Sequence, residues 1–261
     1  MKPFDKIIYP YSKISRLPEV SQPLALLFRY FISRSPKYTF QADCMATSNN
    51  FGFTQTSRFQ FAEKRAIEAS GFDYRIPLRI HQAIWCADHG SKLDPKASWV
   101  ELGTGRGYLM SAILGSFEYS NLEIPQVFLF DTFESIATDK KSAQTTNLGL
   151  NIYYAESFEK AHNTFSRYSN VTLVRGKLPE SLQFTNSLGK ISFLHIDLNA
   201  PEIEISCLRL LWEKILPGGV LLIDDYACGG FEYTYQLFNS IARELNFSIL
   251  TTASGQGIAI K

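Results

Sequence analysis

The stretch that decides the fold class reads Trp99-Val-Glu-Leu-Gly-Thr-Gly-Arg-Gly-Tyr108. An apolar strand pattern runs here into three glycines spaced by two, and a helical pattern follows over residues 109–114. The glycines are Gly103, Gly105 and Gly107. Glycine adopts positive φ and lets backbone approach a ligand closely, and the first turn of a helix carries unpaired N–H groups. The stretch predicts a nucleotide-type cradle between a strand and a helix. A glycine turn that only closes a tight connection is the alternative.

Short apolar runs alternate with helical patterns from residue 97 onward. That rhythm is typical of parallel strands joined by crossover helices. The expected strands are 98–102, 126–131, 171–175, 191–197 and 219–224, followed by a closing hairpin of 247–250 and 257–260 through Ser254-Gly255. Further helical patterns cover 77–89, 155–168, 202–215 and 233–245. The predicted fold class is α/β: a Rossmann-like, seven-stranded, mostly parallel sheet with helices on both faces.

The first 90 residues differ from the rest of the chain. Aromatic residues, Ser, Asn and Pro are mixed there with weak periodicity until the helical pattern that starts near Pro77. We expect residues 1–90 to form an N-terminal extension of helices and loops that packs on the sheet or covers the active site, and residues 91–261 to form the α/β domain. A small separate domain is the alternative, but no Pro, Gly or Ser-rich linker precedes Trp99.

Composition and charge narrow the classes of partner. The chain has 261 residues, of which 45% are hydrophobic, and its 26 basic and 25 acidic residues give a net charge of +1. Such a balance leaves no excess of positive charge that would attract a polyanion, so we expect no nucleic-acid partner. We expect no membrane insertion, because no apolar run approaches roughly 18 residues. Four widely separated cysteines indicate neither a zinc cluster nor a disulfide framework, which favours a cytoplasmic location.

A second candidate binding residue, Asp131, ends the next predicted strand. A carboxylate at that point accepts hydrogen bonds from both hydroxyls of an adenosine ribose. A dinucleotide fingerprint would place its third glycine where this chain has Tyr108, so the pattern disfavours a nicotinamide-dependent oxidoreductase. Asp131 as a helix cap or turn residue, together with Thr132, is the alternative.

The glycine segment resembles the first motif of class I S-adenosylmethionine-dependent methyltransferases. Phe128-Leu-Phe-Asp-Thr-Phe-Glu134 is similar to the second-strand motif of the macrocin O-methyltransferase (TylF-type) family. Further matches are Asn170-Val-Thr-Leu-Val-Arg-Gly-Lys-Leu-Pro-Glu-Ser-Leu182, His195-Ile-Asp197 and Leu216-Pro-Gly-Gly-Val-Leu-Leu-Ile-Asp-Asp-Tyr226. The matches cover about residues 97 to 230 in the expected order. The resemblance implies that residues 91–261 form an S-adenosylmethionine-binding methyltransferase domain.

The resemblance also implies which residues hold this cofactor. Gly103, Thr104, Gly105 and Gly107 would surround its methionine part, while Asp131 with Thr132 would hold the ribose. Gly176 and Phe133 would lie near the adenine. Glu101 would orient the glycine loop, or a water bound there, toward the cofactor's amino group. Pairing of Glu101 with backbone N–H groups at the strand end is the alternative.

Three carboxylates follow two predicted strands: Asp197 after the fourth, and Asp224 and Asp225 after the fifth. The carboxyl ends of parallel strands line one crevice, so these side chains should converge. Like charges close together need protons or a cation, and a hard divalent ion suits oxygen ligands. Helix caps and turn formers are the alternative. In the resembling family the matching aspartates bind Mg²⁺, which chelates neighbouring hydroxyls of a sugar.

Asp197 is the candidate catalytic residue, since a carboxylate beside a metal ion can take the proton of an activated hydroxyl. The family commonly has a second carboxylate two residues later, where this chain has Asn199. On a regular strand Asn199 would face the site, but a neutral amide cannot accept the proton. Glu202, Asp225 or a metal-bound hydroxide could substitute. His195 is interpreted as a buried histidine with satisfied hydrogen bonds.

The leading functional hypothesis is an S-adenosylmethionine-dependent O-methyltransferase, assisted by Mg²⁺, that acts on a hydroxyl of a sugar or glycosylated small molecule. One alternative keeps the methyltransferase but dispenses with the metal and methylates another nucleophile. The other is a non-catalytic S-adenosylmethionine-binding protein. The expected partner is a small-molecule substrate, and a homo-oligomer is compatible with the sequence.

Overall fold

The computed structural model describes residues 38–43, 45–133, 157–184 and 187–261. By compactness the chain divides into two units. One comprises Met1–Phe40 and Thr47–Asn50, and the other comprises Gln41–Ala46 and Phe51–Lys261. Strands β1 (Phe40–Ala42) and β2 (Met45–Thr47) form a two-stranded sheet. All the helices and the large sheet described below belong to the second unit.

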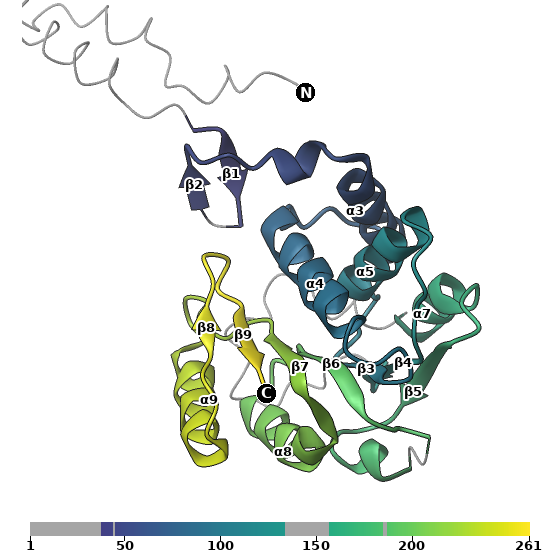
Figure 1. Ribbon diagram of the computed structural model, residues 1–261, viewed down its shortest axis with the longest axis vertical. Coiled ribbons are helices and arrows are strands. Elements are labelled where there is room, and N and C mark those ends of the chain that lie inside the picture. Colours follow the sequence, from purple (N-terminus) through teal and green to yellow (C-terminus); the bar gives the residue numbers. More distant parts are fainter. Residues whose placement is uncertain (1–37, 44, 134–156, 185–186) are drawn as a thin grey trace, which may run out of the picture. The chain divides into compact units, whose positions relative to one another are not determined.

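The large sheet has seven strands in the order β5-β4-β3-β6-β7-β9-β8 (Figure 1). The strands are β3 (Ser98–Leu102), β4 (Val127–Asp131), β5 (Val171–Arg175), β6 (Ile191–Ile196), β7 (Ile215–Ile223), β8 (Leu250–Thr251) and β9 (Gly257–Ile260). The first five run parallel, while β9 is antiparallel to both β7 and β8. The predicted Rossmann-like, mostly parallel seven-stranded sheet is confirmed.

Helices cover both faces of this sheet (Figure 1). They are α3 (Ser57–Ser70), α4 (Pro77–Gly90), α5 (Tyr108–Tyr119), α7 (Ser157–Phe165), α8 (Pro201–Leu211) and α9 (Glu232–Leu245), with short 3-10 turns η2 (Gly52–Gln55), η3 (Glu180–Phe184) and η4 (Trp212–Lys214). Successive strand residues point to opposite faces. Trp99 accordingly packs in the core under α3, α4 and α5, and Val100 packs in the core under α8 and α9.

Several elements differ from the predictions; among them, strand β7 starts at Ile215 rather than at residue 219. Helix α3 was not predicted, because its buried face is made mainly of small residues, Ala62, Ala66 and Ala69, rather than large apolar ones. Strand β8 starts three residues later than predicted. The N–H of Phe247 bonds to the carbonyl of Ala242 at 2.9 Å, so it completes the end of α9 instead of a strand.

The central strands β3 and β6 meet closely at their carboxyl ends. The N–H of Asp197 donates to the carbonyl of Leu102 at 2.8 Å. The next residue, Gly103, has φ of +90°, and a Cβ there would lie 1.9 Å from the carbonyl oxygen of Asp197. Only glycine fits at this position, because a side chain would have to push the two strand ends apart.

No helix in the described ranges combines the length and the apolar character needed to cross a membrane.

Gly103→Ala should lower the free energy of unfolding by more than about 2 kcal/mol. Left-handed backbone alone costs an ordinary residue about 1–2 kcal/mol, and the clash with Asp197 adds to that cost. Urea unfolding followed by circular dichroism measures the change. Gly189→Ala is the matched control, since a Cβ there meets nothing within 4 Å, and it should shift stability by less than about 1 kcal/mol. Equal stability of the two variants would contradict the prediction.

Candidate functional site

The loop from β3 to α5 contains the three predicted glycines, and all of them have left-handed backbone. Their φ angles are +90° for Gly103, +52° for Gly105 and +80° for Gly107. The N–H of Gly107 closes the loop by donating to the carbonyl of Thr104 at 2.7 Å. A Cβ on Gly107 would lie 2.4 Å from the ring of Phe165. The loop therefore needs glycine for its turns and for its packing, and α5 begins directly after it.

Asp131, at the carboxyl end of β4, binds this loop directly. Its Oδ2 accepts the N–H of Gly105 at 2.7 Å, and its Oδ1 accepts the N–H of Phe133 at 2.8 Å. The hydroxyl of Thr132 lies 3.5 Å from Oδ1. The turn-forming role is thus realised, and the same two bonds hold the carboxylate at a fixed position beside the glycine loop.

The two residues expected near the adenine both donate their N–H groups to Asp131. The N–H of Gly176, directly after β5, donates to the carbonyl of Asp131 at 3.0 Å. Phe133 is 3% exposed, and its ring packs against Phe158 at 5.3 Å between centroids. Gly176 therefore borders the same strand ends, whereas most of the Phe133 ring surface belongs to the core.

Glu101 makes a contact that was not anticipated. Its Oε1 lies 3.0 Å from Nδ1 of His195, the residue opposite it on β6, and both side chains are almost fully buried. Glu101 therefore pairs with a side chain rather than with backbone N–H groups. Glu101 Oε2, His195 Nε2 and the hydroxyl of Thr104 are buried without a hydrogen-bond partner in the described part of the chain. His195 is thus only half satisfied.

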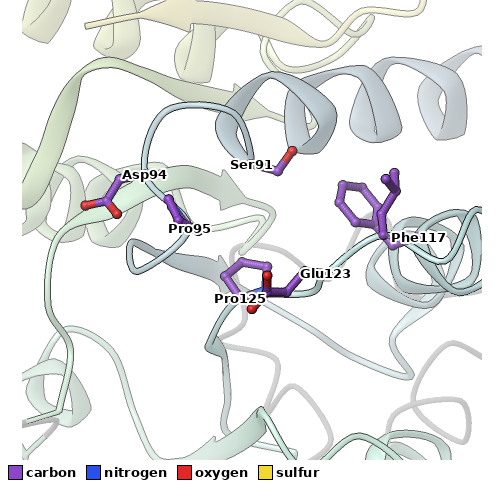
Figure 2. A pocket seen from close by; sticks show the side chains of 7 residues that line it. Ser91, Asp94, Pro95, Phe117, Glu123 and Pro125 are labelled. Atoms are coloured by element: carbon purple, nitrogen blue, oxygen red, sulfur yellow. The ribbon is translucent and has the colours of Figure 1, made fainter.

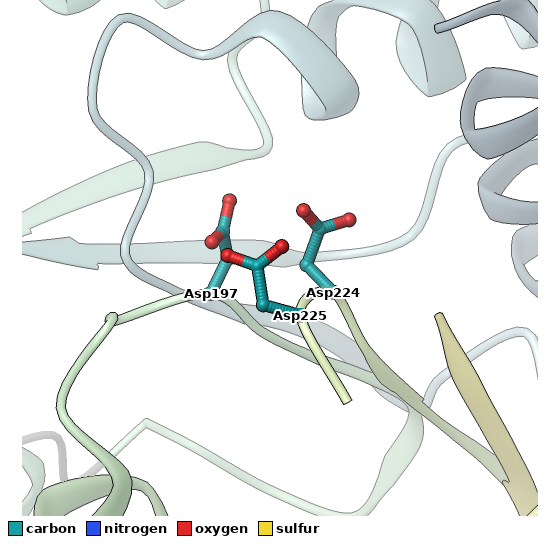
Figure 3. Close-up of side chains that lie close together, drawn as sticks. All are labelled: Asp197, Asp224 and Asp225. Atoms are coloured by element: carbon teal, nitrogen blue, oxygen red, sulfur yellow. The ribbon is translucent and has the colours of Figure 1, made fainter. Parts of the chain in front are cut away.

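Asp197, Asp224 and Asp225 come together as predicted (Figure 3). One carboxylate oxygen from each lies within 4.8 Å of those of the other two. Burial, followed by the charges of Asp224 and Asp225, raises the pKa of Asp197 well above its usual range. Burial and the charge of Asp224 also raise the pKa of Asp225, against the opposing effect of Arg79.

Arg79 is the residue that sequence reasoning missed. It lies in the first turn of α4, and its Nη1 pairs with Asp224 and, at 3.2 Å, with Asp225. Burial opposes the charged guanidinium, but the two carboxylates raise its pKa above the ordinary value. Gln256 Nε2 donates to the other oxygen of Asp224 at 2.6 Å. No local pattern could reveal these pairs, because Arg79 and Asp224 are 145 residues apart.

These residues fit both groups that the sequence implies. Three carboxylates and one guanidinium leave a formal charge of −2, which one divalent cation would balance, and carboxylate oxygens are the ligands that Mg²⁺ prefers. For the cofactor, the unpaired Oε2 of Glu101 offers an acceptor to an ammonium group, and the left-handed glycine loop leads directly into the N-terminus of α5.

Asn199 does not lie where a regular strand would put it. Strand β6 ends at Ile196, and Asn199 is exposed with a left-handed φ of +55°. The buried carboxylate of Glu204 accepts the N–H groups of Leu198 and Ala200 at 3.2 and 3.3 Å, which fixes this turn. The expectation from strand alternation was therefore wrong, because the alternation stops before the residue it concerned.

A pocket of about 180 Å³ (Figure 2) lies near the amino ends of strands β3 and β4. Pro95 and Pro125, which line it, come shortly before β3 and β4, and Phe117 forms part of its wall. Ligands of open α/β sheets bind at the carboxyl ends of the strands. The pocket is therefore separate from the candidate site.

Comparison with known proteins bears on this arrangement. Residues 100–226, from β3 to just past β7, match a family model described as a methyltransferase domain. The solved structure of the O-methyltransferase NovP is similar, with a TM-score of 0.60 and 16% identity over 76% of this chain and 88% of NovP. The calicheamicin methyltransferase CalS11 is similar with a TM-score of 0.54 and 12% identity over 87% of this chain and 99% of CalS11. No curated protein matches the sequence.

At these identities the likeness to solved structures concerns the fold. The domain match covers the strands that carry the glycine loop, Asp131 and the three aspartates. The domain match and the Rossmann-like fold together support an S-adenosylmethionine-dependent methyltransferase.

Proposed function

We propose that the protein transfers the methyl group of S-adenosylmethionine to a hydroxyl of a sugar or glycosylated small molecule, with the help of Mg²⁺. One observation carries the proposal. The backbone of Asp197 packs against Gly103 in the glycine loop, while its carboxylate belongs to the cluster with Asp224 and Asp225. A cofactor in the cradle and a hydroxyl at the carboxylates would therefore be neighbours.

The proposed cofactor site uses the residues around the ends of β3, β4 and β5. Asp131 would accept the ribose hydroxyls, and Gly176 would border the adenine with Phe133 and Thr132. Gly103, Thr104, Gly105 and Gly107 would surround the methionine part. The unpaired Oε2 of Glu101 would accept from its ammonium group. S-adenosylmethionine, when bound, supplies a methyl group on a positively charged sulfur.

The chain's part in the reaction is to position the acceptor and take its proton. Asp197, Asp224 and Asp225 would hold the metal ion, whose charge lowers the pKa of a bound hydroxyl. Asp197 would then be the base that takes the proton of the activated hydroxyl. Because methyl transfer depends on alignment, the glycine loop and the carboxylates would contribute mainly by holding the cofactor and the acceptor hydroxyl in position.

The choice of a sugar acceptor, as in a TylF-type enzyme, has separate support. CalS11, which shares the fold, is a TDP-rhamnose 3′-O-methyltransferase. The His195-Ile-Asp197 and Leu216–Tyr226 motifs resemble the macrocin O-methyltransferase family. A vicinal diol also suits a cation held by three carboxylates, because two neighbouring oxygens can complete its coordination.

A metal-independent methyltransferase is the second candidate, and Arg79 is the observation that favours it. The guanidinium already supplies one positive charge to the carboxylates through its pairs with Asp224 and Asp225. In that reading Asp197 would take the proton without a metal ion, and catalysis would rest on positioning.

Asp131→Asn should weaken binding of S-adenosylhomocysteine about tenfold or more, because the neutral amide has one acceptor oxygen where the carboxylate has two, and a hydrogen bond to a charged group is worth about 1.5–3 kcal/mol. Isothermal titration calorimetry measures the affinity. Asp94→Asn is the matched control, since Asp94 also accepts a backbone N–H in a turn, from Lys96 at 2.9 Å. Unchanged affinity in Asp131→Asn would leave Asp131 with its turn-forming role alone.

Chelation should abolish methyl transfer and Mg²⁺ should restore it, since the metal activates the hydroxyl. The assay measures S-adenosylhomocysteine formed with a panel of nucleotide sugars, glycosides and phenols. Asp224→Asn should lose the response to Mg²⁺, whereas Asp94→Asn should keep it. Methylation that persists in chelator would select the metal-independent candidate. Failure to methylate any acceptor would favour a non-catalytic binding protein.

A further inference from the structure

We infer that Arg79 is a positioning residue that sets the net charge of the carboxylate cluster, and thereby its preference for doubly over triply charged cations. The inference rests on the proposed metal site and adds to it a residue from outside the domain match, which begins at residue 100.

The backbone around Arg79 is held in place from outside its own helix. The N-cap residue of α4, Ile76, makes no capping hydrogen bond with its own side chain. Asp43, directly after β1, supplies that function by accepting the N–H of Leu78 at 2.8 Å and the N–H of Arg79 at 3.3 Å. Further along α4, Gln82 accepts the hydroxyl of Ser254 at 2.7 Å. Arg79 is therefore presented to the cluster from a fixed first turn.

The guanidinium contacts three groups at once. Nη1 lies between Asp224 and Asp225, and Nη2 donates to Sγ of Cys228 at 2.8 Å. The side chain of Arg79 is 16% exposed, and those of Asp224 and Asp225 are 8% and 22% exposed. Because water screens these pairs only partly, the positive charge acts strongly on the carboxylates and on any ion held between them.

The charge has a consequence for ion selectivity. With Arg79 present the cluster carries −2, which a divalent ion neutralises; without it the three carboxylates carry −3, which a trivalent ion neutralises. Repulsion between the guanidinium and an ion grows with the charge of the ion. Arg79 therefore penalises a trivalent ion more than a divalent ion of similar coordination.

The test is the ratio of the affinities for La³⁺ and Mn²⁺. Free Mn²⁺ is measured by electron paramagnetic resonance, and La³⁺ is measured by its displacement of bound Mn²⁺. Arg79→Met should raise the ratio by about tenfold or more, the size that Coulomb's law gives for one unit charge near contact distance in a partly hydrated site. Arg79→Met also removes any positioning of the carboxylates by the guanidinium, but that loss affects the affinities for both ions. The ratio of the two affinities therefore reports the effect of the charge.

Two further variants separate charge from geometry. Arg79→Lys keeps the charge, but a single ammonium group cannot bond to the carboxylates and Cys228 as the guanidinium does. The affinities for La³⁺ and Mn²⁺ should therefore both fall, while their ratio should stay unchanged. Asp225→Asn leaves a formal charge of −1 and should lower the ratio. Circular dichroism and S-adenosylhomocysteine binding report whether Arg79→Met folds. If it does not fold, Asp225→Asn still tests the effect of charge on the affinity ratio.

An unchanged ratio in a folded Arg79→Met protein that still binds Mn²⁺ would overturn the inference and leave the proposed function intact. A ratio that does not fall in Asp225→Asn would also overturn it. If the unaltered protein binds neither ion, the metal assistance in the proposed function fails together with this inference, while S-adenosylhomocysteine binding in the same sample reports separately on the cofactor site.

Discussion

The contact between Gly103 and the carbonyl of Asp197 is the constraint on which the candidate site depends. It leaves no space for a Cβ at residue 103, so the backbone of the glycine loop is in direct contact with the backbone that follows β6. The loop is tied in turn to Asp131 through the N–H of Gly105. The carboxylate of Asp131 and the backbone contact at Gly103 therefore connect β4, through the cradle, to the first of the three aspartates.

Charge is the second organising element of the site. The aspartates that follow β6 and β7 would repel one another if they stood alone, and the raised pKa of Asp197 reflects its burial first and then that repulsion. Arg79 offsets part of it from a helix on one face of the sheet, and Gln256 adds a neutral donor from the hairpin that ends the sheet. The cluster is thus held by donors from two separate parts of the chain, which restricts how far its carboxylates can move.

Sequence patterns predicted the features that depend on neighbouring residues. The bounds of β3, β5 and β9 were found where the apolar runs placed them, and the three glycines have the left-handed backbone that their spacing indicated. Periodicity could not reveal α3, whose buried face is mostly alanine, or the partner of Glu101 across the sheet. The role of Arg79 was not predicted for the same reason, because it depends on residues that are close in the fold but distant in the sequence. The three aspartates predicted only that some positive charge or protons would be needed beside them.

The order of the strands has a consequence for how the molecule assembles. Gly105 and its partner Asp131 are 26 residues apart, whereas Glu101 and His195 are 94 apart. Closing the longer loop costs more chain entropy, and pairings of distant segments slow folding. During synthesis on a ribosome, the half of the sheet that forms the cradle can emerge complete while the half that carries the aspartates is still unmade. Strand β9, which follows the other six strands of the sheet in chain order, pairs with β7, so the sheet is complete only after all seven strands have been synthesised.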